Sequence, residues 1–357
     1  MNRFDCLISD THYHNFDQFS TTVDGVNSRL LHIIEATREA FEHALKEGAT
    51  RVIHDGDCFH VRGKIIPSVL NPVLNLYKEY EGKFEDGIHM IAGNHDLEGR
   101  DSEWVSNASS ALQGVGVNVV TEPTWIDEET LLMPWFANLD DLREELSNQL
   151  DDSNGNAHVH LHAQLNGVIS GIPDHGFSYE ELAKYKAKRF YFGHYHNHKV
   201  FDIDDDKSVV SVGALTHQNF GDISSRAGFI LVEGDSVKHF ETQAPKFVDV
   251  NMDLISEEED YEDAVYHVPG NFVRVRASEL SIEESSSLKN DMKERGALGV
   301  SIVATPKTNV TERKDSVDTE KSETLEGSIE SYVESRDSIR KNRVVKEALA
   351  VLQEVEA

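Results

Sequence analysis

Five short polar segments, rich in Asp, Asn and His, each follow an apolar run that has the length of a β-strand. The segments begin at Asp10, Asp55, Gly93, His162 and Gly193. In open α/β sheets, binding sites form at the carboxyl ends of the strands. Five strands that end in Asp, Asn or His therefore predict one convergent site.

The side chains in these segments indicate what the site binds. The candidate ligands are two aspartates, one asparagine and four histidines, namely Asp10, His12, Asp57, Asn94, His162, His194 and His196. With no thiolate pair beside them, these donors favour divalent ions such as Mn, Fe or Zn. Seven donors are too many for one ion with an open position, but they suit two ions that share a carboxylate. Such a pair, about 3.5–4 Å apart, can hold a hydroxide and clamp a phosphate.

Some of these choices have alternatives. His160 and His162 share one face of a strand, and we prefer His162 because it ends the apolar run. We expect His60 to be functional, the alternative being a polar residue at the start of a helix. The remaining nearby histidines are interpreted as supporting or surface residues: His14, His54, His89 and His198. Three bases flank the motifs and could touch phosphates, although isolated bases are usually just solvated: Arg62, Lys64 and Lys199.

The apolar patterns predict the elements that position these residues. We expect strands at 4–9, 51–54, 87–92, 116–120, 130–133, 157–161, 189–192, 209–212 and 228–233. Helices are expected at 28–47, 68–80, 138–150 and 178–187. Strands that alternate with helices up to about residue 200, followed mostly by strands, indicate an α/β domain over residues 1–244.

The remainder of the chain changes character. Residues 255–263 are strongly acidic and predict a loop, and a small βαβ unit is expected from 271–304, within a second domain at 245–305. Residues 306–323 have the composition of a linker. Residues 324–357 predict one or two amphipathic helices, which we expect to bind a partner rather than pack back on this chain.

Composition narrows the class of protein. Cys6 and Cys58 are too few for a disulfide framework, and no run approaches the roughly 20 apolar residues of a membrane span. With no signal-peptide pattern recognised, we expect a soluble, cytoplasmic protein without membrane partners. The net charge of −30 opposes loose binding to nucleic acid. Bound dications or a basic partner subunit would offset it.

The motifs Asp-x-His, Gly-Asp-x-x-His, Gly-Asn-His-Asp and Gly-His-x-His, in this order, resemble those of the calcineurin-like metallophosphoesterases. His60 stands where protein phosphatases of that superfamily carry an Asp-Arg pair and the nuclease branch carries a His. The chain therefore resembles the SbcD-type DNA repair nucleases, including their phage forms. The resemblance is strong through residue 240, weak over the βαβ unit, and a matter of pattern alone in the tail.

The resemblance implies a two-sheet metallophosphoesterase sandwich flanked by helices, with a small βαβ cap and a helical C-terminal tail. One metal would take Asp10, His12, Asp57 and His196, and the other Asp57, Asn94, His162 and His194, so that Asp57 bridges. His95 would act on the leaving oxygen, with Asp96 in support, and His60 would position the phosphate or assist His95.

The resemblance further implies Mn-dependent exonuclease and endonuclease activity on DNA, with Fe or Zn as alternative metals. Its partners would be an SbcC-type coiled-coil ATPase, bound through the C-terminal helices, and a second copy in a homodimer. If the chain is phage-encoded, its compartment would be the host cytoplasm.

Two rival functions remain open. The first is a phosphodiesterase or phosphatase that acts on a small nucleotide or phosphoprotein, although such an enzyme needs neither cap nor tail. The second is a non-enzymatic adaptor, which has no reason to keep seven ligands.

Overall fold

The computed structural model describes residues 4–99, 107–204 and 206–306. Two six-stranded sheets have the orders β14-β13-β1-β4-β5-β6 and β11-β12-β10-β9-β8-β7. The first contains β1 (Phe4–Ile8), β4 (Arg51–His54), β5 (Ile88–Ile91), β6 (Val117–Val120), β13 (Gly228–Glu233) and β14 (Ser236–Glu241). The second contains β7 (Thr124–Trp125), β8 (Thr130–Met133), β9 (His158–His162), β10 (Arg189–Gly193), β11 (Lys199–Asp202) and β12 (Ser208–Ser211).

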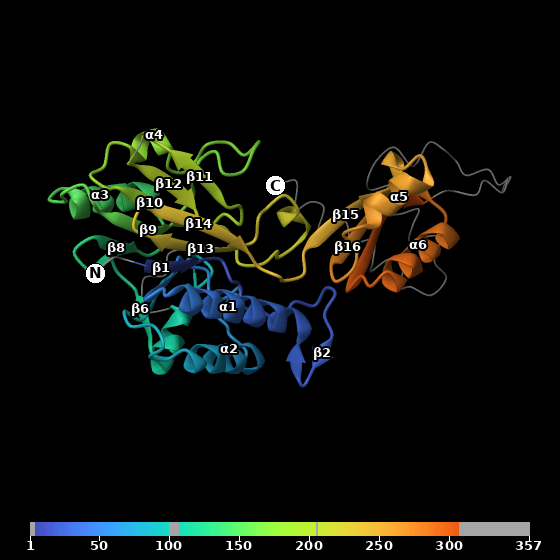
Figure 1. The fold of residues 1–357 in the computed structure, drawn as a ribbon, viewed down its shortest axis with the longest axis horizontal. Helices are drawn as coiled ribbons and strands as arrows, with labels where there is room; N and C mark the ends of the chain where they lie inside the picture. The colour runs from blue at the N-terminus through green and yellow to red at the C-terminus, as the bar shows by residue number, and fades with distance from the viewer. Residues whose placement is uncertain (1–3, 100–106, 205, 307–357) are drawn as a thin grey trace, which may run out of the picture. The chain divides into compact units, whose positions relative to one another are not determined.

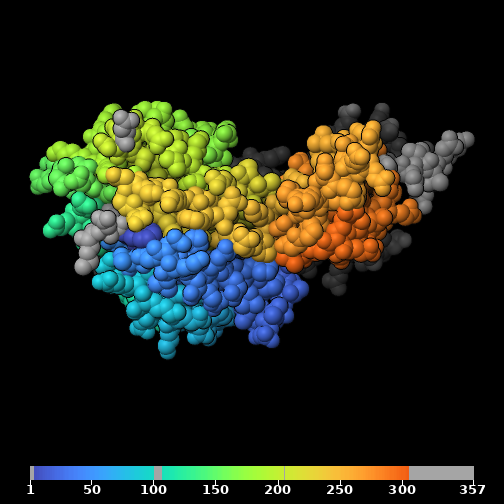
Figure 2. All heavy atoms as spheres, viewed as in Figure 1, coloured from blue at the N-terminus to red at the C-terminus, as the bar shows by residue number. Residues whose placement is uncertain are grey.

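Four adjacent strands of each sheet are parallel, and the remaining strands at the edges pair antiparallel. The two sheets share an apolar core that is made by side chains from both, including Leu7, Ile53, Tyr191 and Val210. Figure 1 shows the sheets as two layers, and the space-filling view in Figure 2 shows a continuous surface over them on this face. The predicted two-sheet α/β sandwich is confirmed.

Helices cover the outer faces of both sheets. The helices α1 (Ser28–Glu47) and α2 (Pro67–Glu79) pack on the first sheet, and α3 (Leu139–Leu150) and α4 (Tyr179–Leu182) pack on the second (Figure 1). The bounds of α1 match the prediction because both ends carry strong signals. Asn27 accepts hydrogen bonds from the backbone N–H groups of Arg29 and Leu30, and Gly48 adopts the left-handed conformation that ends a helix.

The helix predicted at 178–187 is shorter than expected, since α4 ends at Leu182. Ser178 caps its start, since its side chain accepts a hydrogen bond from the Glu181 backbone N–H. The Lys207 ammonium then donates to the carbonyl oxygens of Ala183 and Tyr185 at 2.8 and 2.6 Å. Carbonyls at the end of a helix need such outside partners, and a lysine distant in sequence supplies them here.

Short elements complete this part of the chain, and the prediction did not include them. They are β2 (Thr22–Val23), β3 (Val26–Asn27) and the 3-10 helices η2 (Ala108–Val115), η3 (Phe220–Asp222) and η4 (Met252–Leu254). The edge strands β7, β11 and β14 also escaped prediction, because their side chains are largely exposed and lack a clear apolar pattern.

A third sheet contains β15 (Phe247–Asn251), β16 (Phe272–Leu280) and β17 (Gly299–Pro306), all parallel, with α6 (Ile282–Glu294) between the last two. The predicted loop at 255–263 is wrong, because α5 (Glu258–Val265) occupies most of it. Glu257 and Asp260 form a reciprocal capping box there, and acidic side chains are favourable at a helix N-terminus. Tyr261, Ala264 and Val265 pack into the core of this sheet.

The chain divides into a unit of Met1–Pro306 and a unit of Lys307–Ala357. The predicted linker and tail lie outside the described residues, and the domain boundary near residue 245 stays a prediction. Among the described helices, none is long and apolar enough to cross a membrane.

Candidate metal centre

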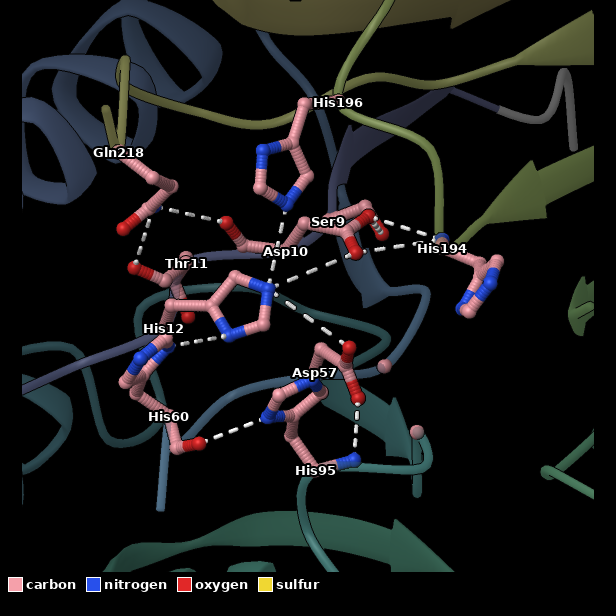
Figure 3. Close-up of polar contacts among 12 residues, drawn as sticks. Ser9, Asp10, Thr11, His12, Asp57, His60, His95, His194, His196 and Gln218 are labelled. Carbon is pink, nitrogen blue, oxygen red and sulfur yellow. Dashed lines mark hydrogen bonds and ion pairs between the residues drawn. The ribbon is translucent and has the colours of Figure 1, made fainter. Parts of the chain in front are cut away.

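The seven predicted ligands come together where the two sheets meet, at the carboxyl ends of five strands. The first sheet supplies Asp10 and His12 after β1, Asp57 after β4 and Asn94 after β5. The second sheet supplies His162 at the end of β9, and His194 and His196 after β10. Figure 3 shows most of these side chains directed toward one another. The donor atoms form two groups, and the atoms within each group all lie within 4.8 Å of one another. The first group is Asp10, His12 and His196, and the second is Asp57, His162 and His194.

The backbone at these positions is strained. Asp10, His12, Asp57 and His194 all have φ between 47° and 102°, which non-glycine residues rarely adopt. Such strain costs of order 1–3 kcal/mol per residue and persists where the surroundings enforce it, commonly at functional sites. Gly93 is required for a related reason, since a Cβ there would lie 2.1 Å from Asp57 Oδ1.

The first group is arranged around His12. Its Nε2 lies 3.9 Å from Asp10 Oδ1, 3.3 Å from His196 Nε2 and 3.6 Å from Asp57 Oδ2. A metal with ligand distances of about 2.0–2.2 Å and angles near 90–110° would hold neighbouring donors about 3–3.6 Å apart. The first group therefore fits one divalent ion, although the distance of 3.9 Å between His12 Nε2 and Asp10 Oδ1 is slightly longer than this range.

The second group surrounds the same Asp57 carboxylate. His162 Nε2 lies 3.4 Å from Asp57 Oδ2 and 3.2 Å from Asn94 Oδ1, and His194 Nδ1 lies 2.9 Å from the same asparagine oxygen. Asp57 Oδ2 is thus close to one histidine of each group. It is the shared donor that a two-ion arrangement needs, and the mixture of nitrogen and oxygen donors suits Mn, Fe or Zn.

Hydrogen bonds on the far side of the rings select which nitrogen faces the site. His162 Nδ1 donates to the Asp55 carbonyl oxygen at 2.7 Å, because a carbonyl can only accept. His196 Nδ1 lies 2.9 Å from the Asp222 carboxylate. Both bonds leave Nε2 with a lone pair for a metal. This outer support of metal-binding histidines commonly raises metal affinity.

Sequence reasoning missed Asp222 and its neighbour Gln218. Asp222 also accepts from the backbone N–H groups of Gln218 and Asn219, while Gln218 Nε2 lies 3.4 Å from the carbonyl oxygens of Asp10 and Thr11 (Figure 3). The sequence signal that could have found these two residues is the polar run that follows β12, which is a further strand of the second sheet. Trp135, which stacks on His194 at 5.6 Å, was also missed.

Without metal, protons balance the buried charges. Burial disfavours the cationic form of His162, but Asp57 outweighs it and raises the pKa of His162 to about 9. The same pairing, against burial, lowers the pKa of Asp57. Burial and the charge of His162 lower the pKa of His194 to about 3. The site therefore attracts positive charge to the Asp57 carboxylate, and a metal would have to displace the His162 proton.

His95 and His60 form a separate pair beside His12. His95 Nδ1 donates to the His60 carbonyl oxygen at 2.7 Å, and the two rings stack at 5.5 Å (Figure 3). The His95 backbone N–H donates to Asp57 Oδ1 at 2.8 Å. His60 Nδ1 lies 3.3 Å from His12 Nδ1. His95 Nε2 is consequently the ring nitrogen that remains for a substrate.

Asp96 contacts the backbone of the ligand loops. Its carboxylate accepts from the N–H groups of Cys58, Phe59 and Gly93 at 2.9–3.2 Å, so it joins the loop of Asp57 to that of Asn94. Burial, with the charge of Asp57, raises its pKa to about 6. We therefore interpret Asp96 as a loop-holding residue; its expected support of His95 would act through that loop.

The other predicted histidines take supporting positions. His160 Nδ1 lies 3.0 Å from the Asp55 carboxylate, whereas His162 reaches Asp57 and Asn94. His54 Nε2 lies 3.0 Å from Thr11 Oγ1 below the site. His89 contacts Asn118 and Asp86 at the surface, and His198 Nδ1 bonds the Ser211 carbonyl.

Comparisons with known proteins indicate the kind of protein that the chain resembles. No family model matches the chain. Over 213 residues it is 26% identical to exonuclease subunit 1 of Enterobacteria phage T4, covering 57% of this chain and 58% of that subunit. The chain thus spans less than two thirds of this relative's length. The similarity confirms the resemblance to metallophosphoesterases of the nuclease type.

A solved structure, the nuclease MPE of Pseudomonas putida, is 19% identical, with 66% of this chain and 87% of that chain covered. The TM-score of that comparison is 0.29.

Proposed function

We propose that the chain is a Mn-dependent DNA nuclease subunit that hydrolyses phosphodiester bonds, as an exonuclease with endonuclease activity. The observation that carries the proposal is the position of Asp57 Oδ2, 3.6 Å from His12 Nε2 and 3.4 Å from His162 Nε2, with His95 held beside it. The similarity to a phage exonuclease subunit supports DNA as the substrate.

The residues have distinct roles in this proposal. Asp10, His12, Asp57 and His196 would hold one ion, and Asp57, Asn94, His162 and His194 the other. Two such ions would polarise the phosphate and supply the nucleophile. His95 binds or protonates the leaving oxygen through Nε2, because its Nδ1 is committed to the His60 carbonyl. His60 orients His95 and His12.

We further propose that residues 324–357 bind a coiled-coil ATPase of the SbcC type, and that the chain forms a homodimer. The phage relative is named a subunit, which supports a complex. Deletion of residues 324–357 should abolish co-elution with the ATPase but spare hydrolysis of bis-p-nitrophenyl phosphate. Retained co-elution would contradict the role of the tail, and light scattering of the full chain tests the dimer.

The proposal is tested by incubating the purified chain with end-labelled linear double-stranded DNA and Mn²⁺, beside an Asp57→Asn control. We expect degradation by the wild-type chain and none by the control. Equal degradation by both would assign it to a contaminating nuclease.

The main rival, a small-substrate phosphodiesterase or phosphatase, predicts a different pattern. It would cleave cyclic nucleotides or phosphopeptides and leave DNA intact even when the ATPase is added. An adaptor would cleave none of these substrates.

A further inference from the structure

A groove opens beside His60, between the segment after β1 and the start of α2. It has a volume of about 200 Å³ and is lined mostly by apolar and aromatic side chains, including Tyr13, His14, Phe59, Val61 and Ile66. Val61 and Ile66 are 37% and 40% exposed, so part of the apolar wall of the groove faces solvent. Small-molecule sites are commonly concave, mostly apolar and supplied with a few polar groups.

A chain of ring contacts connects this groove to the metal centre. His14 lies 5.1 Å from His60 between ring centroids, and His60 stacks on His95 at 5.5 Å with an interplanar angle of 18°. Phe16 lies 5.1 Å from both His14 and His60. Only the His60 ring therefore separates the His14 wall from the residue assigned to the leaving oxygen, and the groove continues the active site.

The charge at the rim selects the class of ligand. Lys64 lines the groove and is exposed, and no ion pair involving Lys64 or Arg62 occurs among the described residues. These cations stand out on a chain with a net charge of −30. An apolar, aromatic hollow with a lysine at its edge complements a flat base attached to a phosphate.

We propose that this groove binds the nucleobase next to the scissile phosphate, so that the substrate is read as a nucleotide turned out of the DNA stack. The inference rests on the proposed function, since it assigns a subsite to the same reaction. The His14 ring, with Tyr13 and Phe59 beside it in the groove wall, supplies aromatic surface for the base, and Lys64 supplies charge for a flanking phosphate. Stacking on aromatic side chains tolerates any base.

The test compares two diesters that share a leaving group and a charge, the p-nitrophenyl ester of thymidine monophosphate and methyl p-nitrophenyl phosphate. The ratio of their kcat/KM values in Mn²⁺ isolates the contribution of the nucleoside. We expect the wild-type chain to favour the thymidine ester by about tenfold or more, as the loss of one stacked base would suggest.

Ile66→Asp should reduce that ratio by about tenfold, since it places a charge in the base subsite. Ile66 is the N-cap of α2 and makes no side-chain cap hydrogen bond, and Asp is a preferred N-cap residue, so α2 should be retained. Ile66→Trp, which fills the groove, should act in the same direction. The matched control is Val200→Asp, because Val200 is 43% exposed on the edge strand β11.

Binding of thymidine monophosphate to the metal-free chain, measured by calorimetry in EDTA, provides a readout that does not need turnover. We expect Ile66→Asp to weaken it about tenfold and Val200→Asp to leave it unchanged. An unaltered ratio and unaltered binding in both Ile66 variants would overturn the groove proposal while leaving the nuclease intact. Nucleotide binding without hydrolysis of any diester would instead reject the proposed function and retain the groove.

Discussion

The two sheets contribute differently to the metal centre. The first sheet supplies every oxygen ligand, from Asp10, Asp57 and Asn94, and two of these ligands stand on left-handed backbone. The second sheet supplies only imidazoles, His162, His194 and His196. Each donor group nevertheless contains residues from both sheets.

This difference couples metal binding to the packing of the sheets. Neither sheet alone brings a full ligand set together, so the core between them, with Leu7 and Tyr191, sets the distances in the site. The bond from His162 Nδ1 to the Asp55 carbonyl also joins a ligand of the second sheet to a loop of the first. We therefore expect metal to stabilise the closed sandwich, because a ligand that binds only the folded state stabilises it.

The largest expected effect is that of Asp57→Asn, which removes the charge shared by both groups. Diester hydrolysis should fall by more than about a thousandfold, since both ions are disturbed. Mn²⁺ should also cease to raise the unfolding temperature. Calorimetry with and without Mn²⁺ measures the unfolding temperature. A rise with Mn²⁺ as large as that of the wild-type chain would contradict the coupling between metal binding and the packing of the sheets.

His95→Ala should produce the next largest effect. Turnover should fall about 10²–10⁴-fold, because a positioned acid or hydrogen-bond donor is lost. Metal content should remain at the wild-type level, since His95 is not one of the seven residues assigned as ligands. Parallel loss of metal and activity would contradict this division of roles.

Asp222→Asn should act on one group of donors only. It weakens the carboxylate support of His196, while the carbonyl support of His162 is untouched. Metal affinity at the first group should fall about 10–100-fold, the usual effect of losing such support. A titration with Mn²⁺ should show one weakened step and one unchanged step, and equal weakening of both would reject separate groups.

A smaller effect is expected at a second junction of the sheets. His198 follows β10 and stacks on His239 of β14 at 4.1 Å. Burial, then the neighbouring His198 and Arg226, lowers the pKa of His239 to about 3, with Glu241 opposing. The pKa of His239 in the folded chain is below its unfolded value of about 6.5. The contribution of His239 to the free energy of unfolding is therefore fully present above about pH 6.5, and it is lost as the pH falls toward the folded pKa.

The metal-free wild-type chain should accordingly lose unfolding temperature between about pH 7 and about pH 5, and His239→Phe should lose less. His175→Phe, at an exposed position, provides a control for removing a histidine. Equal pH slopes in wild-type and His239→Phe would show that this stack does not respond to acid.

Local signals predicted much of the fold. The ends of α1 follow from Asn27 and Gly48, and most central strands follow from their apolar runs. The acidic run at 255–263 was wrongly predicted as a loop, because acidic residues also form the capping box of α5 and apolar residues among them pack into the core of the third sheet. The end of α4 could not be predicted, since it depends on Lys207 from a distant loop.

The candidate site divides in the same way. The seven ligands were found because they occur in ordered motifs after strands. Asp222 was missed because its contact with His196 joins loops that only the folded sheets bring together. The backbone role of Asp96 likewise depends on two loops meeting. Motifs therefore identify the ligands, and tertiary contacts identify what holds them.

The central claim is that Asp57 is shared by two ions. It is tested most directly by loading the metal-free chain with Mn²⁺, counting the bound ions and recording the electron paramagnetic resonance spectrum. We expect two ions per chain, with the spin coupling of a bridged pair that disappears in Asp57→Asn. A single ion per chain, or two uncoupled ions with a spectrum unchanged in Asp57→Asn, would contradict the shared site.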